Sequence, residues 1–488
     1  MPVRLAIVVE ALRQAGLLVA ERGVLPQFVD AVTDDSRTVG SNALFLAVRG
    51  SERDGHDYLE VAARDGAIVA VVDDLSRTAL PALVVSDTRR AAAIAAATFY
   101  GVPALRLRLV GVTGTNGKTT TVGMLRHLLD APTVRCASIG TLGILVGSEG
   151  VALDGGSGLT TPGPVELQRV LRALYDAGVR TVAMETSSHA LHQNRVEGLR
   201  FVAGVFTNLT RDHLDYHVTM EAYLAAKAML VSLLAADGAA VVNADDTAWN
   251  ALPSAPRTVR FGMLGHGDVR ATALRYTPTG SSWMLTLGAA CYPVLLPLIG
   301  DFNVANALGA AAAAWAIGVP GEEIAGRLSS MPQVPGRLEI ISDAPTVLRD
   351  YAHTPDALAR ALLAVRPFTA GKLIAVFGCG GDRDRGKRPE MGRIAESRAD
   401  LAIVTSDNPR TEDPERILDD IEVGMTAGRH ERIADRRNAI ARAIRASEVG
   451  DVIVLAGKGH ETYQIRGTVK HPFDEREIVR DIISNGAT

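Results

Sequence analysis

Apolar residues along this chain fall into short runs that alternate with longer stretches of helical spacing. Runs rich in Val, Leu, Ile and Ala, such as residues 43–48, 67–72 and 82–86, have the composition of buried strands. Residues 87–101 instead repeat apolar positions with the spacing of a helix packed on one face. Because such strands and helices alternate, the pattern predicts an α/β fold with parallel sheets covered by helices.

The alternation starts afresh twice, which predicts three domains for a chain of 488 residues. The first domain, residues 1–105, ends where Gly101 and Pro103 stop a helix. The second, residues 106–335, repeats the strand-then-helix order after a glycine-rich turn. The third, residues 336–488, follows a Val-Pro-Gly-Arg segment that we interpret as a hinge. We expect a central parallel-sheet domain that binds phosphate and a Rossmann-like C-terminal domain.

Composition and charge exclude several classes of protein. The net charge of -4 argues against a nucleic-acid-binding surface. Three cysteines indicate neither a disulfide framework nor a zinc cluster. The N-terminal segment carries Glu10 and Arg13 within an amphipathic helix, so it is not a signal peptide, and no apolar run has membrane-spanning length. These observations predict a cytoplasmic, globular enzyme that does not insert into membranes.

The clearest chemical motif is LVGVTGTNGKTTTV, in which an apolar run leads through a glycine-rich turn into a helix near Lys118. Backbone N–H groups of such a turn cradle phosphates, a lysine neutralises the β- and γ-phosphates, and the next hydroxyl, here Thr119, binds Mg²⁺. Val112 occupies the position of the first glycine of the usual pattern, and Gly111 and Gly114 supply the flexibility. The motif predicts nucleotide binding but does not identify the reaction.

Two residues after later strands are candidate metal ligands. Glu185 lies at the carboxyl end of the strand TVAMET, and His213 follows the next strand, in TNLTRDHLDYH. In parallel sheets the carboxyl ends of strands hold the ligands. A single histidine is more often structural, so His213 gains weight only from its place beyond a strand of the same sheet.

Lys227 lies on a predicted helix within an apolar stripe made by Tyr223, Leu230 and Leu234. Such a lysine commonly extends its amine to solvent. Alternatively, its amine is desolvated, has a lowered pKa and captures CO₂ to become an anionic metal ligand. The residues alone leave both interpretations open.

Arg410 lies in the loop SDNPRTEDP, after the apolar run ADLAIVT. The simple interpretation is a solvated charge between a strand and a helix capped by residues 411–413. A guanidinium on a turn can also bind a carboxylate through two parallel hydrogen bonds.

Ordered motifs along the whole chain resemble those of the Mur ligases, ATP-dependent amide-forming enzymes of peptidoglycan synthesis. They include DDSRTV, FLAVRGSERDGHDY, GVTGTNGKTT, METSSHALHQNRV, FTNLTRDHLDYH, GDFNVANA, VPGRLE, RDYAHTPDAL, FGCGGDRDRGKR, DNPR and GKGHE. The resemblance is greatest to members that add the third amino acid of the peptide. It implies that the side-chain carboxylate of D-Glu in UDP-MurNAc-L-Ala-D-Glu is activated by ATP as an acyl phosphate. The amine of meso-diaminopimelate then attacks this intermediate.

The resemblance also assigns binding residues. The UDP-muramyl-peptide is expected at Asp34, Ser36, Ser51, Glu52, Arg53, Thr160, Thr161, Ser187, Gln193 and Arg195. ATP is expected at Gly114, Thr115, Asn116, Gly117, Lys118, Thr119, Thr120, Asn306, Arg337, Asp350 and His353. Catalysis is assigned to Lys118, Glu185, His213 and Lys227. Mg²⁺ ions are expected at Thr119, Glu185, His213 and Lys227, the last as a carboxylated lysine.

Diaminopimelate differs from lysine by one carboxylate at its far end, and a buried cation that would be left unpaired rejects the analogue. The resemblance places that cation at Arg410, which members that add lysine typically lack. The acceptor pocket is expected to comprise Arg383, Asp407, Asn408, Pro409, Arg410, Gly457 and Glu461.

Three other functions fit the residues less well. Folylpolyglutamate synthase shares the phosphate loop, but the DSR, DGH and DNPR motifs argue against it. A P-loop kinase or GTPase is disfavoured because no guanine-reading Asn-Lys-x-Asp follows. An inactive binding scaffold is disfavoured by the intact Lys118, Glu185, His213 and Lys227. We expect a monomer.

Overall fold

The computed structural model describes residues 2–50, 53–153, 155, 158–277, 279–426 and 428–486. The chain divides into two compact units. Unit 1 comprises Met1–Arg270, Thr286–Ala290 and Asn306–Ile324, and unit 2 comprises Ala271–Leu285, Cys291–Ala305 and Ala325–Thr488. No helix in these described ranges is long and apolar enough to cross a membrane.

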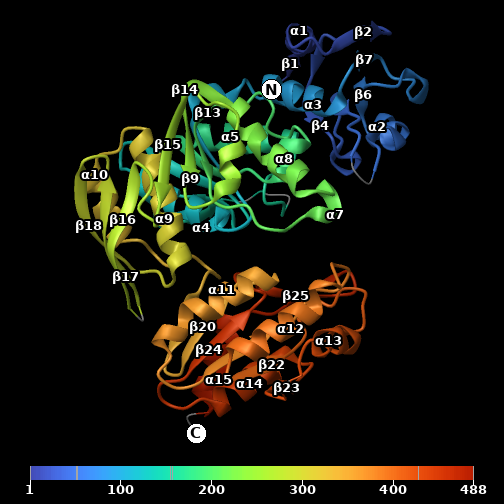
Figure 1. The fold of residues 1–488 in the computed structure, drawn as a ribbon. Helices are drawn as coiled ribbons and strands as arrows, with labels where there is room; N and C mark the ends of the chain where they lie inside the picture. Colours follow the sequence, from blue (N-terminus) through green and yellow to red (C-terminus); the bar gives the residue numbers. More distant parts are fainter. Residues whose placement is uncertain are drawn as a thin grey trace. The chain divides into compact units, whose positions relative to one another are not determined.

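The N-terminal part of unit 1 is a five-stranded sheet with the order β2-β7-β6-β5-β4, in which β4 to β7 are parallel and β2 is antiparallel (Figure 1). The predicted strands and helix at residues 43–101 are confirmed as β5, β6, β7 and α3. Asp87 begins α3 by accepting hydrogen bonds from the N–H groups of Arg89 and Arg90. The elements are β1 (Val3–Arg4), α1 (Leu5–Gln14), β2 (Leu18–Arg22), β3 (Phe28–Val29), β4 (Ala31–Thr33), η1 (Ser36–Thr38), β5 (Ala43–Leu46), η2 (Gly55–Tyr58), α2 (Leu59–Arg64), β6 (Ala67–Val72), η3 (Leu75–Arg77), β7 (Ala82–Val85), α3 (Thr88–Phe99) and η4 (Pro103–Arg106).

The central part of unit 1 contains the strands β11-β10-β9-β12-β8-β13-β14-β15, in that order across a larger sheet. Strands β9, β12, β8, β13, β14 and β15 are mutually parallel, and β10 is antiparallel to both β9 and β11. The predicted helix start at Lys118 is confirmed. The elements are β8 (Arg108–Thr113), α4 (Lys118–Leu129), β9 (Arg135–Gly140), β10 (Gly143–Val146), β11 (Val151–Leu153), α5 (Pro164–Asp176), β12 (Val179–Glu185), α6 (Ser188–His192), β13 (Phe201–Phe206), α7 (Leu214–His217), α8 (Met220–Ser232), β14 (Leu234–Asn243), η5 (Thr247–Ala251), β15 (Arg257–Gly262) and β16 (Val269–Thr277).

Two glycines let helix α8 pack closely on the centre of this sheet. A Cβ atom on Gly111 of β8 or Gly204 of β13 would lie 3.1 Å from side-chain atoms of Leu230. Leu230 is fully buried together with Phe201 and Leu234 in the core between the sheet and its helices. This close packing carries Lys227, one turn before Leu230, over the end of β8.

Unit 2 contains a six-stranded sheet with the order β19-β20-β24-β21-β22-β23, parallel except for β19. Alternate residues of β21 pack on opposite faces: Phe377 packs with α11 to α13, and Val376 with α14 and α15. This is the predicted Rossmann-like arrangement. Most of α9 belongs to unit 1. The remaining elements of the two units are β17 (Gly280–Leu287), β18 (Ala290–Leu296), α9 (Asp301–Ala316), α10 (Gly321–Ser329), β19 (Glu339–Asp343), β20 (Thr346–Asp350), α11 (Pro355–Val365), η6 (Arg366–Phe368), β21 (Leu373–Phe377), α12 (Lys387–Arg398), β22 (Leu401–Val404), α13 (Pro414–Glu422), β23 (His430–Arg432), α14 (Arg436–Ala446), β24 (Val452–Ala456), β25 (Tyr463–Arg466), β26 (Val469–Pro472) and α15 (Glu475–Gly486).

Candidate nucleotide and amino-acid sites

The glycine-rich loop joins β8 to α4 and depends on two glycines with positive φ. At Gly114, with φ of 151°, a Cβ atom would lie 1.9 Å from the hydroxyl of Thr207. At Gly117, with φ of 84°, a Cβ atom would lie 2.2 Å from Oδ1 of Asn306. The predicted nucleotide residues Gly117 and Asn306 are therefore neighbours, although nearly two hundred positions separate them.

Residues after the neighbouring strand β13 fix the shape of this loop. The backbone N–H of Thr115 donates to the carbonyl of Asn208 at 2.7 Å, and the N–H of Asn116 donates to Asn208 Oδ1 at 2.9 Å. The hydroxyl of Thr207 donates to the carbonyl of Asn116 at 2.7 Å. Sequence reasoning did not select Thr207 or Asn208, but their place in FTNLT, after the strand beside β8, could have indicated them.

Glu185 lies at the end of β12, is 1% exposed and accepts hydrogen bonds from two segments. Thr119 Oγ1 donates to its Oε1 at 3.0 Å, and the N–H of Thr141 donates to the same oxygen at 2.8 Å. A Cβ atom on Gly140 would lie only 2.3 Å from Oε1, so glycine keeps this side of the carboxylate open. A hydroxyl and a carboxylate are ligands that Mg²⁺ prefers, so this pair fits the predicted ion. Thr141 was not predicted.

Lys227 is 1% exposed and does not extend to solvent. Its Nζ donates to the carbonyl of Gly114 at 2.7 Å and lies 4.3 Å from the ring centre of Tyr223. Nζ of Lys118 donates to the same carbonyl and to that of Thr115, both at 2.9 Å. Burial, and then the positive charge of Lys118, lower the pKa of Lys227 well below its ordinary value. The structure therefore favours the desolvated amine over the solvent-directed one.

His213 is more exposed than the other predicted metal ligands. Its side chain is 44% exposed, and its ring lies edge-on to that of His189, with centroids 4.8 Å apart. Partial loss of hydration, together with the charges of Lys118 and Lys227, lowers the pKa of His213. Within the described ranges, no three or more His, Cys, Asp or Glu side chains are grouped as a metal site. The structure thus brings Thr119 and Glu185 together and leaves His213 nearby.

The predicted muramyl-peptide residues of the central sheet form one connected group around Glu185. Thr161 Oγ1 donates to the Glu185 carbonyl at 2.8 Å and accepts from the N–H of Ser187 at 3.1 Å. Arg195 donates to the carbonyl of Thr161 at 3.1 Å and, through Nη2, to Gln193 Oε1 at 2.6 Å. Thr160 belongs to the same group, because its hydroxyl lies 3.3 Å from that of Thr141.

The predicted residues of the N-terminal sheet are only partly joined to that group. Loss of hydration raises the pKa of Asp34, and the nearby charge of Arg195 partly opposes the shift. Ser36 begins the short helix η1, and Arg53 lies on an exposed turn, where its carbonyl accepts from the N–H of Gly50 at 2.8 Å. Ser51 and Glu52 lie outside the described residues.

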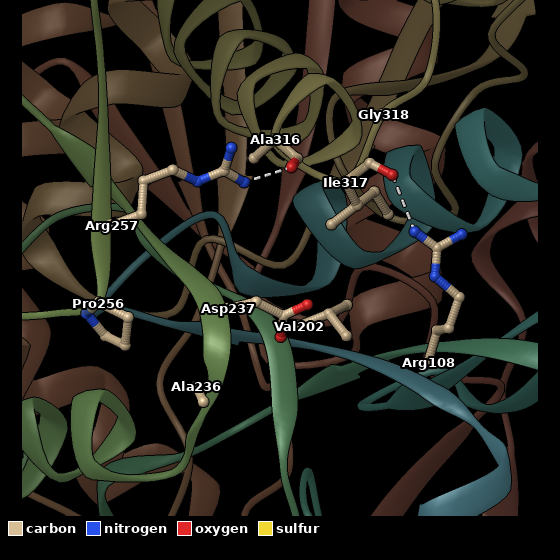
Figure 2. Close-up of a pocket in the computed structure, with 9 residues that line it drawn as sticks. All are labelled: Arg108, Val202, Ala236, Asp237, Pro256, Arg257, Ala316, Ile317 and Gly318. Carbon is tan, nitrogen blue, oxygen red and sulfur yellow. Dashed lines mark hydrogen bonds between the residues drawn. The ribbon is translucent and has the colours of Figure 1, made fainter.

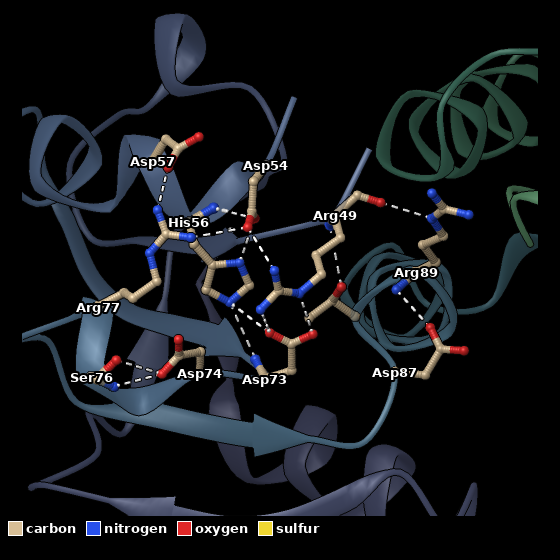
Figure 3. A network of polar contacts seen from close by, with 11 residues as sticks. Arg49, Asp54, His56, Asp57, Asp73, Asp74, Ser76, Arg77, Asp87 and Arg89 are labelled. Carbon is tan, nitrogen blue, oxygen red and sulfur yellow. Dashed lines mark hydrogen bonds and ion pairs between the residues drawn. The ribbon is translucent and has the colours of Figure 1, made fainter. Parts of the chain in front are cut away.

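A polar network supports the base of this turn (Figure 3). Arg49 pairs with Asp54 at 2.7 Å and with Asp73 at 2.8 Å. The fully buried ring of His56 lies between the same two carboxylates, 2.7 Å from Asp54 and 3.1 Å from Asp73. These contacts fix Arg49 and Asp54, which also form an isolated antiparallel β-bridge, and Asp54 directly follows Arg53.

In unit 2, the other predicted ATP residues surround Tyr351. The guanidinium of Arg337 lies 4.9 Å from the centre of the Tyr351 ring, and Nδ1 of His353 lies 2.9 Å from the Tyr351 carbonyl. Asp350 accepts from the N–H groups of Leu338 at 2.7 Å and Ala352 at 2.8 Å. Burial is the main cause that raises the pKa of Asp350 to about 6.

The predicted acceptor residues converge at the carboxyl ends of β22 and β24. Asn408 Nδ2 donates to Glu461 Oε2 at 2.9 Å. The fully buried Lys458 donates to Asn408 Oδ1 at 3.1 Å and to Glu461 Oε2 at 3.0 Å. A Cβ atom on Gly457, which has φ of 116°, would lie 2.4 Å from Asp407 Oδ2. Lys458 was missed, although its place in GKGHE between two predicted residues could have indicated it.

Arg410 is not a freely solvated charge. Its Nη1 donates to the carbonyl of Gly381 at 2.7 Å, and its φ of 53° lies in the left-handed region that non-glycine residues rarely adopt. A Cβ atom on Gly380 would lie 2.9 Å from Arg410 Nη1 and 3.8 Å from Cγ of Arg383. Both predicted arginines therefore flank Gly380. Asp413 caps the following helix α13, as expected.

A pocket of about 590 Å³ lies elsewhere in unit 1, lined by residues at β8, β13, β14, β15 and the end of α9 (Figure 2). Arg108 donates to the carbonyl of Ile317 at 2.8 Å, and Arg257 donates to that of Ala316. Arginines at a helix C-terminus satisfy its last carbonyls and its dipole. Both arginines stabilise the end of α9, and none of the predicted site residues lines this pocket.

A glycine-rich loop before a helix, with a lysine and a hydroxyl at its start, defines a P-loop nucleotide-binding fold. Three family models match consecutive segments: "Mur ligase family, catalytic domain" at residues 29–110, "Mur ligase middle domain" at 112–314, and "Mur ligase, glutamate ligase domain" at 336–459. The chain belongs to the Mur ligase family. The α/β fold class and the resemblance inferred from the sequence are confirmed.

Relatives match nearly the whole chain. It is 45% identical over 481 residues to UDP-N-acetylmuramoyl-L-alanyl-D-glutamate--2,6-diaminopimelate ligase of Synechococcus elongatus, covering 95% of this chain and 96% of the relative. The ligase of the same name from Geobacillus kaustophilus is 45% identical over 463 residues, covering 92% and 94%. A solved structure with this name has a TM-score of 0.67 and 35% identity, covering 95% and 96%. Folylpolyglutamate synthase of Mycobacterium tuberculosis shares the fold at 20% identity, over 76% of this chain and 92% of that chain, with a TM-score of 0.64.

Proposed function

We propose that this chain is an ATP-dependent ligase that joins meso-diaminopimelate to the D-Glu side-chain carboxylate of UDP-MurNAc-L-Ala-D-Glu. One observation carries the proposal: relatives bearing that name align with 95% of the chain at 45% identity. The phosphate loop, Glu185 and the Arg410 pocket agree with it. The structural likeness to folylpolyglutamate synthase covers less of the chain and shows only the shared fold.

In the proposed reaction, the substrate carboxylate attacks the γ-phosphate of ATP and gives an acyl phosphate and ADP. Repulsion between the two anions opposes this step. The amine of Lys118 donates to two carbonyls of the phosphate loop. Its positive charge and the N-terminus of α4 offset part of the negative charge of the two anions. Thr119 and Glu185 would hold Mg²⁺, with His213 and a carboxylated Lys227 holding a second ion. Bound Mg²⁺ would neutralise charge on the transferring phosphoryl group.

The acceptor amine then attacks the acyl carbonyl and expels phosphate. We propose that Arg410 and Arg383 bind the distal carboxylate of the acceptor, while Asp407, Asn408 and Glu461 orient its ammonium. Lys458 and Asn408 donate to the same oxygen of Glu461, so they fix the orientation of its carboxylate. A guanidinium held in one pose discriminates against lysine, because lysine would leave it unpaired.

We also propose three domains with boundaries near residues 105 and 335, a monomeric state and a location in the cytoplasm. Within the two units, the N-terminal sheet of unit 1 would hold the UDP end of the substrate. Light scattering over a range of protein concentrations measures the molar mass and so tests the monomeric state. A mass twice that of one chain would contradict it.

The test of function is phosphate release with ATP, Mg²⁺ and UDP-MurNAc-L-Ala-D-Glu, compared with meso-diaminopimelate and lysine as acceptors. We expect release with diaminopimelate and an amide product that mass spectrometry identifies. Equal or preferential use of lysine would contradict the acceptor assignment. No release with either acceptor would contradict the ligase assignment.

A further inference from the structure

Arg388, on the first turn of α12, has a fully buried side chain although it carries a permanent charge. Nη1 and Nη2 donate to the two carboxylate oxygens of Glu412 at 3.0 and 2.9 Å. Nη1 also donates to Asp420 at 2.8 Å. A buried guanidinium requires such paired acceptors, because its desolvation is otherwise costly. The two parallel bonds to Glu412 fix both distance and orientation.

This ion pair connects two loops. One is the segment 380–384, in which the Gly380 carbonyl accepts from Arg388 Nη2 at 3.3 Å. The other is the segment 408–412, which carries Glu412. Glu412 Oε1 also accepts from the N–H of Asp382 at 2.5 Å, so its carboxylate contacts the first loop directly.

Further contacts join the same two loops. The carboxylate of Asp382 accepts from Thr411 Oγ1 at 2.7 Å and from the Thr411 N–H at 3.2 Å. The N–H of Gly381 donates to the carbonyl of Asn408 at 2.9 Å. Arg383 belongs to the first loop and Arg410 to the second, so the contacts that join the loops also set the spacing of these two guanidiniums.

We propose that Arg388 and Glu412 are positioning residues for acceptor selection, which hold the loops of Arg383 and Arg410 at the separation that a distal carboxylate requires. This inference rests on the proposed function. Neither residue is proposed to contact the substrate. The hydrogen bonds from Arg388 lower the pKa of Glu412 to about 2, so the pair is ionised at neutral pH.

Two variants disturb the connection to different degrees. Glu412→Gln keeps the size of the side chain but turns one acceptor oxygen into a donor that faces Arg388. Thr411→Val keeps the β-branched shape and removes only the hydroxyl bond to Asp382, so it tests the inference even where the first variant folds poorly. Arg432→Gln is the control, because Arg432 pairs with Glu415, Asp419 and Glu422 on α13 and with neither loop.

The experiment measures kcat, the KM of each substrate and the Tm for the full-length chain with meso-diaminopimelate as acceptor. We expect Glu412→Gln to raise the acceptor KM at least about tenfold, because misplacement of binding groups by a fraction of an ångström is costly. Thr411→Val should raise the acceptor KM less than Glu412→Gln does. In both variants, the KM values of ATP and the muramyl substrate should stay within about twofold of those of the unsubstituted chain. The control Arg432→Gln should leave the KM values of all three substrates unchanged.

An unchanged acceptor KM in both variants would overturn the inference. The inference would also be overturned if kcat and Tm fell while the KM values of all three substrates rose together, because that pattern indicates a general structural role. If the unsubstituted chain releases no phosphate with diaminopimelate, the proposed function fails and the inference fails with it. A chain that is active but shows no split between KM values rejects only the inference.

Discussion

Lys227 and Lys118 donate hydrogen bonds to the same oxygen atom, the carbonyl of Gly114, at 2.7 and 2.9 Å. Two amines that approach one acceptor so closely repel each other if both are charged. Lys227 is the more buried of the two, and its pKa is lowered well below its ordinary value. Burial and the neighbouring charge of Lys118 therefore both disfavour the charged form of the Lys227 amine.

We predict that Lys227 reacts with CO₂ to form a carbamate. In ¹³C-bicarbonate, NMR of the unsubstituted chain should show a carbamate resonance that Lys227→Met lacks and that the exposed control Lys372→Met retains. Lys227→Met should also lose at least about a hundredfold in kcat, since a metal ligand is removed. Identical spectra for all three proteins would contradict the modification.

The pair formed by Thr119 and Glu185 predicts a specific dependence on Mg²⁺. Glu185→Gln and Thr119→Val should each raise the Mg²⁺ concentration for half-maximal phosphate release by about tenfold or more. Glu197→Gln is a control, because Glu197 pairs with Arg90 away from the loop. An unchanged Mg²⁺ dependence in the two site variants would argue against their role as ligands.

Gly117→Ala should abolish ATP binding, because the new Cβ atom would collide with Asn306 as well as require an unfavourable backbone. Gly178→Ala is a matched control: its φ of 85° is nearly the same, but nothing lies within 4 Å of the added atom. The control should lose about 1 kcal/mol of stability and keep nucleotide binding. Calorimetric titration with ATP distinguishes the two, and equal binding by both variants would contradict the steric argument.

Substitutions at Arg410 should separate stability from specificity. Arg410→Ala and Arg410→Gly should both lose use of meso-diaminopimelate while ATP binding stays near normal. Arg410→Gly should be more stable than Arg410→Ala by about 1 kcal/mol, because glycine adopts the φ of 53° without strain. Denaturant unfolding measures this difference, and an alanine variant as stable as the glycine variant would show that the backbone relaxes.

The buried carboxyl of Asp350 predicts a pH-dependent stability. Its pKa is about 6 in the folded chain, above the ordinary value of 3.8, so folding favours the protonated form. The stability from this group is therefore complete below about pH 4 and is lost as the pH rises through 6. Relative to Asp350→Asn, the unsubstituted chain should lose about 3 kcal/mol between pH 4 and 7, as measured by urea unfolding. A constant difference over that range would contradict the shift.

The elements and fold class could be predicted because apolar runs and helical spacing reflect local burial directly. The predicted helix that carries Lys227 is α8, and the predicted strand before Glu185 is β12. The phosphate loop was predictable for the same reason, since its chemistry lies within one continuous segment that ends at the start of α4.

Contacts between segments far apart in the sequence could not be predicted, even where a motif could have indicated the residue itself. Asn208 shapes the loop at Thr115 only because β13 pairs with β8, and Lys458 reaches Asn408 only because β24 and β22 flank β21 in one sheet. The choice between two environments for Lys227 also required the fold, because the periodicity of α8 does not show what covers its apolar stripe.

Glu185 has a consequence for how the two substrates influence each other. Its Oε1 accepts from Thr119 beside the phosphate loop, and its carbonyl accepts from Thr161 in the predicted muramyl-peptide group. A single residue thus contacts both predicted sites. Any ligand that shifts Glu185 from one side changes the free energy of binding on the other, and thermodynamic linkage makes that effect reciprocal. Inhibitors directed at either site should therefore be judged in the presence of the other substrate.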